Sequence, residues 1–274
     1  MLKEIHHKMK ILGTNIYYEY YHHPQQTDTI VLIHGFLSST FSYRKLIPLL
    51  KKHFSIIAID LPPFGKSEKA TKFFYSYHNM AKAVIELLER LQIKQAVIVG
   101  HSMGGQISLY AAKQKPDLFK KIVLICSSGY MQKMPSSLIF CSYLPCFYLY
   151  VKRQFIRQGV WKSLCSVVHD QSLINEDMIY GYSEPFYDDK IFRALTRMIR
   201  EREGDLSSQD LKTIEIPCLL VWGEEDKIVP IEVGYQLQKD LPISRFVSFK
   251  QTGHLVPEER PYHVSNHIFD FCFG

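Results

Sequence analysis

Six short apolar runs constrain the fold of this 274-residue chain more than any other feature. They are TIVLI (29–33), SIIAI (55–59), QAVIV (95–99), KIVLI (121–125), CLLVW (218–222) and RFVSF (245–249). Most are continuous and rich in Ile and Val, the pattern of strands that are buried on both faces of a parallel sheet. A chain of this length can bury a sizeable core around such a sheet.

Helix-like segments separate several of these runs. Between residues 76 and 91, apolar side chains recur at helical spacing on one face, with charged side chains on the others. A second helix is expected from Met103 until Pro116 stops it, and a last one around 264–271. Strands that alternate with helices predict an α/β fold with a mostly parallel, doubly wound sheet.

The alternation fails in two places. Residues 8–21 contain two strand-like runs around a Gly-Thr-Asn break, which predicts an antiparallel hairpin at the sheet edge. Between about 129 and 211 there is no clear parallel-strand run, and a loop of that length without its own structure would be unusual. We therefore expect a core of residues 1–128 and 212–274 with an inserted helical cap, 129–211, in which 188–203 forms one helix.

Composition argues against several functional classes. The lysines and arginines are scattered, so the net charge of +6 does not indicate a nucleic-acid partner. The first ten residues lack the apolar run of a secretory signal, which favours a cytoplasmic location. The six cysteines form no CxxC pair, so no zinc site is expected, and Cys126 and Cys218 have the context of buried apolar residues.

The motif Gly100-His101-Ser102-Met103-Gly104 directly follows the third apolar run. Ligands of open parallel sheets bind beyond the carboxyl ends of the strands. A GxSxG pattern between strand and helix is typical of a sharp turn that lifts the serine oxygen above the sheet, and side chains at 100 or 104 would press on neighbouring elements. An isolated serine here would instead suggest a helix N-cap, so assigning Ser102 as a nucleophile requires partners.

A catalytic serine needs a base and a carboxylate that orients the base. Candidates for both follow the last two apolar runs, with Asp226 in GEEDKIVP and His254 in QTGH. The chain order Ser, Asp, His is the order of this architecture. Glu224 and Glu225 compete with Asp226 for the role of the acid.

Five motifs, VLIHGF, DLPPFGKS, GHSMGG, WGEEDKIVP and TGH, together resemble the α/β-hydrolase fold superfamily, in particular its small bacterial members with a cap. The resemblance covers nearly the whole core and stops at the cap. It implies a triad of Ser102, His254 and Asp226, because a G-x-x-D-x-[IV]-x-P pattern places the acid at 226. Some relatives carry the acid after an earlier strand, but the matching CSSGY here has no carboxylate. No metal or organic cofactor is implied.

The same resemblance implies an oxyanion hole formed by the backbone N–H groups of Phe36 and Met103. His34 and His101 flank these elements, and we expect structural hydrogen bonding from both. Family members commonly have glycine where Pro63 stands. Because proline cannot adopt a left-handed conformation, this loop is expected to follow a different path and to reshape the pocket entrance.

The first half of the cap contains an uncharged stretch of 18 residues, 134–151, followed by Lys152, Arg153 and Arg157. Its prolines, serines and tyrosines argue against a stable transmembrane segment and favour a lid helix with one face on the core. An aromatic acyl pocket and a lid in transient contact with lipid both stay open. The two arginines, at i and i+4, face either solvent or a substrate carboxylate. The predicted pocket residues are Phe36, Tyr143, Phe147 and Trp161.

These features predict a serine hydrolase that cleaves a small-molecule carboxylic ester with an apolar or aromatic acyl group through an acyl-enzyme. Alternatives are a carbon–carbon bond hydrolase acting on a diketone or a lyase that uses the same triad, and a ligand receptor or regulator without turnover. A serine at 102 counts against dehalogenase and epoxide hydrolase chemistry, which need a carboxylate nucleophile. The oligomeric state is not predicted.

Overall fold

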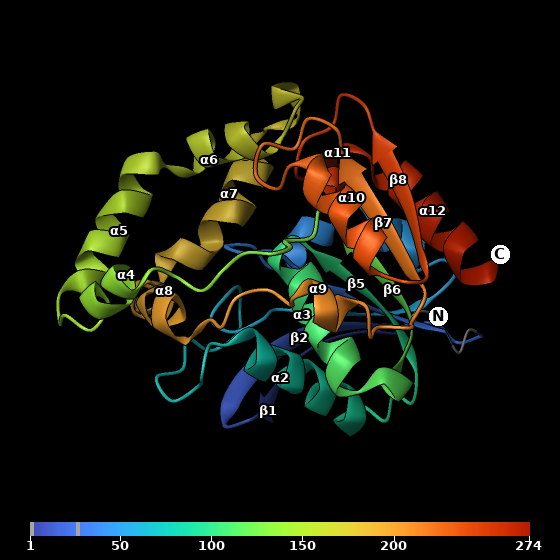
Figure 1. Ribbon diagram of the computed structural model, residues 1–274, viewed down its shortest axis with the longest axis horizontal. Helices are drawn as coiled ribbons and strands as arrows, with labels where there is room; N and C mark the ends of the chain where they lie inside the picture. The colour runs from blue at the N-terminus through green and yellow to red at the C-terminus, as the bar shows by residue number, and fades with distance from the viewer. Residues whose placement is uncertain (1–2, 26–27) are drawn as a thin grey trace.

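A computed structural model describes residues 3–25 and 28–274; the remaining four residues of the predicted core lie outside it. An eight-stranded sheet, flanked by helices, runs through the molecule in the order β1-β2-β4-β3-β5-β6-β7-β8 (Figure 1). The strands are β1 (Lys3–Ile11), β2 (Thr14–His22), β3 (Thr29–Ile33), β4 (Ser55–Ile59), β5 (Ala96–His101), β6 (Phe119–Ile125), β7 (Cys218–Gly223) and β8 (Ser244–Phe249). The predicted α/β class is confirmed.

All six apolar runs lie in strands, apart from Gln95, which precedes β5, and these six strands, β3 to β8, are mutually parallel. Every residue of β3, β4, β5 and β7 is buried. The continuous Ile and Val runs follow from this burial, because neither face of these strands meets water. β8 closes one edge of the sheet and is only partly buried.

The N-terminal hairpin is also confirmed. β1 and β2 pair antiparallel, with Ile11 opposite Thr14, and β2 pairs antiparallel with β4. Leu12 and Gly13 form the two-residue turn with positive φ angles of 46° and 79°, so the turn begins one residue before the predicted Gly-Thr-Asn break. Two left-handed residues in succession match the twist of a tight hairpin.

The three core helices predicted from the sequence are present as α2 (Tyr77–Arg90), α3 (Met103–Gln114) and α12 (Pro261–Phe273). Ser76 caps α2 by accepting a hydrogen bond from the amide of Asn79. Three further core helices were not predicted, namely α1 (Ile47–Leu50), α10 (Ile231–Asp240) and α11 (Val256–Glu259). Two of these are single turns without enough residues to show a period.

The insertion between β6 and β7 is helical, as predicted, and extends to one side of the sheet (Figure 1). Its helices are α4 (Ser136–Cys141), α5 (Phe147–Gln158), α6 (Val160–Val167), α7 (Glu176–Ser183), α8 (Lys190–Glu201) and α9 (Ser208–Leu211). The uncharged stretch 134–151 is divided between α4 and α5. Among the helices in the described ranges, none combines the length and the apolarity needed to cross a bilayer. The cap boundaries 129 and 211 stay a prediction.

Candidate active site

Ser102 occupies a strained turn between β5 and α3. Its φ and ψ angles are 54° and −121°, a conformation that side chains rarely adopt. A Cβ atom at Gly100 would lie 2.3 Å from the carbonyl oxygen of Gly104, and one at Gly104 would lie 2.2 Å from that of Ile33. The two glycines are therefore required by the close approach of α3 to β5 and to the end of β3, as the motif predicted.

Asp226 and His254 lie in the loops that follow β7 and β8, and both are buried. The Nδ1 atom of His254 is 2.7 Å from Oδ2 of Asp226. The other carboxylate oxygen accepts hydrogen bonds from the amides of Ile228 and Val229, at 2.8 and 2.9 Å. With Asp226 ionised, the proton of the neutral imidazole belongs on Nδ1, which leaves the lone pair on Nε2 free to act as a base.

The surroundings of Asp226 keep it ionised. Burial raises its pKa, but the bond to His254 and the two amides outweigh that effect, so the pKa lies below its usual value. The neighbouring glutamates are engaged elsewhere: Glu224 accepts from the hydroxyl of Ser248 and Glu225 from the amide of Thr252. Of the three carboxyls in this loop, Asp226 is the one that bonds His254 in the described structure.

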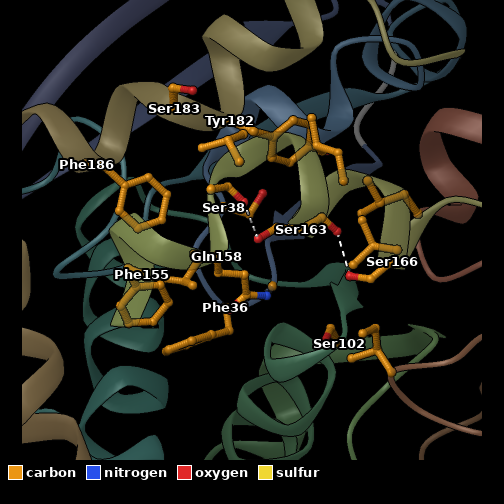
Figure 2. A pocket seen from close by; sticks show the side chains of 18 of the residues that line it. Phe36, Ser38, Ser102, Phe155, Gln158, Ser163, Ser166, Tyr182, Ser183 and Phe186 are labelled. Carbon is orange, nitrogen blue, oxygen red and sulfur yellow. Dashed lines mark hydrogen bonds between the residues drawn. The ribbon is translucent and has the colours of Figure 1, made fainter. Parts of the chain in front are cut away.

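Ser102 and His254 line one cavity of about 610 Å³ (Figure 2). No hydrogen bond among the described residues joins the Ser102 hydroxyl to His254, and such contacts often form only when substrate is bound. The cap contacts the His254 loop, because the amides of His254 and Leu255 donate to the carbonyl oxygen of Val167 at the end of α6, at 2.7 and 3.0 Å. The cap therefore helps to set the position of the histidine.

The two predicted oxyanion donors lie beside the serine. Met103 is the first residue of α3, and Phe36 follows β3. A Cβ atom at Gly35 would lie 3.1 Å from Cβ of Ser102, so the loop that carries Phe36 packs against the nucleophile turn. Within the described residues, neither amide donates a hydrogen bond to the protein. Both donors are therefore available to a substrate oxygen.

His34 and His101 make structural hydrogen bonds, as predicted. The amide of Leu61 donates to Nε2 of His34, whose Nδ1 is 2.7 Å from the carbonyl oxygen of Gly35. Nε2 of His101 is 2.9 Å from the carbonyl oxygen of His254. Burial lowers the pKa of His34 to about 4, and burial together with the nearby His254 lowers that of His101 to about 3. Both rings are neutral at physiological pH.

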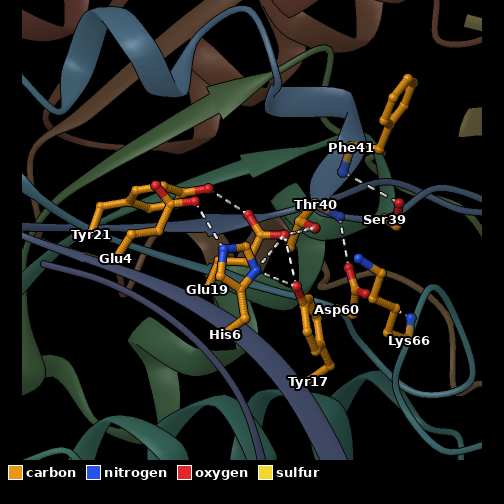
Figure 3. A network of polar contacts seen from close by, with 10 residues as sticks. All are labelled: Glu4, His6, Tyr17, Glu19, Tyr21, Ser39, Thr40, Phe41, Asp60 and Lys66. Atoms are coloured by element: carbon orange, nitrogen blue, oxygen red, sulfur yellow. Dashed lines mark hydrogen bonds and ion pairs between the residues drawn. The ribbon is translucent and has the colours of Figure 1, made fainter. Parts of the chain in front are cut away.

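A polar network around Asp60, which sequence reasoning missed, fixes the loop after β3 (Figure 3). The two carboxylate oxygens of Asp60 accept hydrogen bonds from the amides of Thr40 and Lys66, each at 2.7 Å. Burial raises the pKa of Asp60 to about 7, although these amides act in the opposite direction. Thr40 also donates to Glu19 on β2, so the network ties the hairpin to the loop carrying Phe36. The signal for it was the aspartate directly after a strand.

The predicted change in the path of the loop at Pro63 stays a prediction, but the proline side chain does not itself form the pocket entrance. Pro63 is buried and does not line the cavity. Its neighbour Phe64 contacts the ring of Phe36 edge to face, with centroids 5.6 Å apart. The loop therefore reaches the cavity only through Phe36, because the proline side chain packs into the interior.

The prediction of the pocket residues is wrong for three of the four. Phe36 lines the cavity, whereas Tyr143, Phe147 and Trp161 do not. Tyr143 and Trp161 are 68% and 52% exposed, and Phe147 packs beside Tyr150 outside the cavity. The apolar wall comes instead from later residues, among them Phe155, Ile156, Leu164, Phe186 and Phe192. Figure 2 shows Phe155 and Phe186 on the cavity wall, on the side away from Ser102.

Polar side chains at the cavity wall include those of Gln158, Ser163, Ser166 and Ser183, but most of the lining surface is apolar (Figure 2). Lys152 forms an ion pair with Asp189, and both line the wall. The buried hydroxyl groups of Ser38 and Tyr182 belong to lining residues and have no hydrogen-bond partner within the described part of the chain. A substrate in this cavity therefore meets mainly apolar surface.

Cys126 lies beside the acid and the base. Its sulfur, a carboxylate oxygen of Asp226 and a ring nitrogen of His254 lie within 4.8 Å of one another, a grouping that metal sites also use. Burial, together with the nearby carboxylate, raises the pKa of the thiol well above its usual value. A metal would need the thiolate, and the oxygens of Asp226 already accept three hydrogen bonds. The residues fit a triad better than a metal site.

Known proteins share this fold. A model of the α/β-hydrolase fold matches residues 28–145 and 169–261. The uncharacterised hydrolase YugF of Bacillus subtilis (strain 168) is 59% identical over 259 residues, which cover 94% of each chain. The 2-hydroxy-6-oxo-6-(2'-aminophenyl)hexa-2,4-dienoic acid hydrolase of Metapseudomonas resinovorans is 26% identical, over 88% of this chain and 83% of that protein. The structure of a serine hydrolase involved in carbazole degradation superposes with a TM-score of 0.82 at 20% identity, covering 98% of this chain and 99% of that chain.

Proposed function

Because the chain belongs to the α/β-hydrolase fold family, we propose that it is a serine hydrolase that cleaves carboxylic esters with Ser102, His254 and Asp226. One observation carries this proposal: an imidazole held by a buried carboxylate at 2.7 Å and a strained serine line the same cavity. The turn, the base and the acid come from the ends of three parallel strands, which is where this fold binds its ligands.

Acylation follows from the orientation of the imidazole. Nε2 of His254 removes the proton from the Ser102 hydroxyl as the oxygen attacks the ester carbonyl. Asp226 stabilises the imidazolium that forms, and its low pKa keeps it ionised while it does so. The amides of Phe36 and Met103 donate to the negative oxygen of the tetrahedral intermediate, and the N-terminus of α3 adds a favourable dipole. The imidazolium then protonates the departing alcohol.

Deacylation reverses these roles with water in place of the alcohol. His254 removes a proton from the water as it attacks the acyl-enzyme carbonyl, and the two amides again hold the oxyanion. Collapse of this intermediate releases the acid and returns the proton to Ser102. The apolar wall around Phe155 and Phe192 is suited to hold the acyl group during both steps.

The cavity favours a neutral ester over a substrate that carries a carboxylate. Lys152 is the only lysine or arginine among the described lining residues, and it is already paired with Asp189. A substrate carboxylate would have to break this pair or lose its hydration without a counter-charge. Arg153 and Arg157 do not line the cavity and are exposed, so a substrate in the cavity does not meet them.

Carbon–carbon bond hydrolysis is the second candidate, because the relative from Metapseudomonas resinovorans is named as a dienoic acid hydrolase. The same triad would serve it. The two candidates differ in the charge of the substrate, so matched turnover assays with p-nitrophenyl butyrate and 2-hydroxy-6-oxo-6-phenylhexa-2,4-dienoate separate them. We expect a higher kcat/KM for the ester. Turnover of the dienoate alone would reverse the assignment.

The nucleophile is tested with Ser102→Ala. We expect kcat for p-nitrophenyl butyrate to fall by at least roughly 10³-fold, and a fluorophosphonate probe to label the wild type but not the variant. Ser137→Ala, an exposed serine on α4, is the control and keeps wild-type values. Equal turnover by wild type and Ser102→Ala would remove Ser102 from the mechanism. Labelling of Ser102 without turnover of either substrate would favour a receptor or regulator.

A further inference from the structure

The outer face of the first three cap helices exposes an extended apolar surface. Phe140 on α4 is 73% exposed, and Ile156 on α5 is 65% exposed. We call this region the outer cap surface; its apolar members are Phe140, Leu144, Leu149, Tyr150, Ile156 and Trp161, all exposed. Soluble monomers rarely expose so many large apolar side chains on consecutive helices without a partner. Of these helices, α4 and α5 lie at the end of the cap farthest from the C-terminus (Figure 1).

The charges on this surface have one sign. No aspartate or glutamate occurs between residues 118 and 169, whereas α5 and α6 carry Lys152, Arg153, Arg157 and Lys162. Lys152 is paired with Asp189 on the inner side. Arg153, Arg157 and Lys162 are exposed, and none has an ion-pair partner in the described ranges. The partner that complements this surface is therefore apolar and anionic.

The arrangement along α5 favours a planar lipid surface. Leu149, Tyr150, Arg153 and Arg157 are all exposed and recur at spacings of three and four, so they share the outward face of the helix. Helices that lie in a membrane interface combine apolar and basic residues in this way, with the cationic ends extending toward the phosphates. At 12 residues, α5 is too short to cross the hydrocarbon core, which fits a position in the plane of the membrane.

The outer cap surface is continuous with the active-site cavity. Ile156 and Tyr187 line the cavity and are at the same time largely exposed. An acyl chain that leaves a bilayer at α5 would meet the apolar wall of the cavity directly.

We propose that the outer cap surface docks on an anionic lipid bilayer and that the cavity takes the acyl chain of a lipid ester from it. The docking stands independently, while the identity of the substrate rests on the proposed esterase function.

Docking is tested by co-sedimentation of the full chain with phosphatidylcholine vesicles with and without phosphatidylglycerol. We expect binding to the anionic vesicles, weakening as salt is raised. The double variant Arg153→Glu/Arg157→Glu is expected to bind at least roughly tenfold more weakly. Its matched control is Lys52→Glu/Lys94→Glu, two exposed lysines shortly before the amino-terminal ends of β4 and β5, and it keeps most of the binding.

Trp161 supplies a second readout. The chain has two tryptophans, of which Trp222 is fully buried and Trp161 is on the outer cap surface. Anionic vesicles are expected to shift the emission to shorter wavelength and to protect it from iodide. Trp161→Phe removes the shift without requiring any change in binding. An unchanged emission while wild type sediments with vesicles would place the contact elsewhere and overturn the proposal.

Three further results overturn docking: no binding to anionic vesicles, equal loss in the control variant, or a dimer in analytical ultracentrifugation that Arg153→Glu/Arg157→Glu dissociates. The last would show that a second copy covers the surface. Turnover of soluble p-nitrophenyl butyrate distinguishes the two proposals, because a wild type that binds vesicles but cleaves no ester refutes the esterase and leaves docking intact. Cleavage of soluble ester without vesicle binding refutes docking alone.

Discussion

The sheet around Ser102 and the cap above it differ in how their side chains are held. Each residue of β5 and β7 is buried, and the catalytic candidates sit on turns braced by backbone contacts. In the cap, α4 buries no residue, α5 buries only Val151 and α6 only Leu164. The catalytic candidates are therefore placed by a rigid framework, whereas the part of the cavity wall that α5 and α6 supply comes from helices with few buried side chains. The part supplied by Phe192 lies on α8, which is well buried. The two regions meet where Val167 holds the amide of His254.

The largest expected effect comes from the sheet region, at Asp226. Asp226→Asn removes the charge that orients His254 and favours the wrong imidazole tautomer, so kcat for p-nitrophenyl butyrate is expected to fall by roughly 10³ to 10⁴-fold. Glu224→Gln changes a neighbouring exposed carboxyl in the same way and keeps wild-type activity. Similar losses in both variants would mean that the acid has been assigned wrongly.

An identical substitution in each region compares their packing. Leu220→Ala in β7 empties a fully buried site and is expected to lower the free energy of unfolding by about 2–5 kcal/mol. Leu149→Ala on the exposed face of α5 is expected to change it by less than about 0.5 kcal/mol. Chemical denaturation followed by circular dichroism measures both. Comparable losses would show that α5 is packed as tightly as the sheet.

The pH dependence of the free energy of unfolding tests whether buried His34 is neutral in the folded protein. Unfolded His34 takes up a proton below about pH 6.5, whereas in the folded protein its pKa is about 4. Between these values the unfolded state binds more protons, so the free energy of unfolding falls as the pH falls. Relative to His34→Gln, which keeps an acceptor for the Leu61 amide, wild type is expected to lose about 1 kcal/mol per pH unit in this window. Parallel curves for the two proteins would contradict the buried neutral state.

The smallest effect concerns the cap. Phe155→Ala enlarges the cavity, where its ring lies 5.9 Å from that of Phe186, and is expected to raise kcat/KM for long-chain relative to butyrate esters by about tenfold. Phe147→Ala removes an aromatic ring from the same helix outside the cavity and leaves the ratio unchanged. The nucleophile remains reactive to fluorophosphonate in both. A change of this kcat/KM ratio in Phe147→Ala but not in Phe155→Ala would mean that the acyl group binds at the residues predicted from the sequence.

The core could be predicted from the sequence because burial on both faces leaves uninterrupted apolar runs. Residues 29–33 and 55–59 match β3 and β4 residue for residue. Candidate site residues could be named because each follows such a run, and the structure brings His254 to Asp226. Asp60 was missed, although it occupies an equivalent place after β4, because its partners are backbone amides that no side-chain pattern reveals.

The cavity wall could not be predicted because α5 is apolar on two faces. Val151 and Phe155 point inward, while Leu149 and Tyr150 are exposed. A helix with apolar residues on both sides gives no periodic signal that separates the cavity from the surface. The prediction therefore chose Tyr143 and Trp161 by their aromatic character, and the orientation of the helices places both outside the cavity.

The proposed acid and base, Asp226 and His254, follow β7 and β8, the last two strands in the chain, which form one edge of the sheet. A nascent polypeptide on the ribosome thus carries the serine turn and the two proposed oxyanion amides long before Asp226 and His254 are made. Since domains of this size are made over many seconds, the proposed triad is complete only when synthesis is nearly finished. The order of the strands in the chain thus delays assembly of the proposed triad until the chain is almost complete.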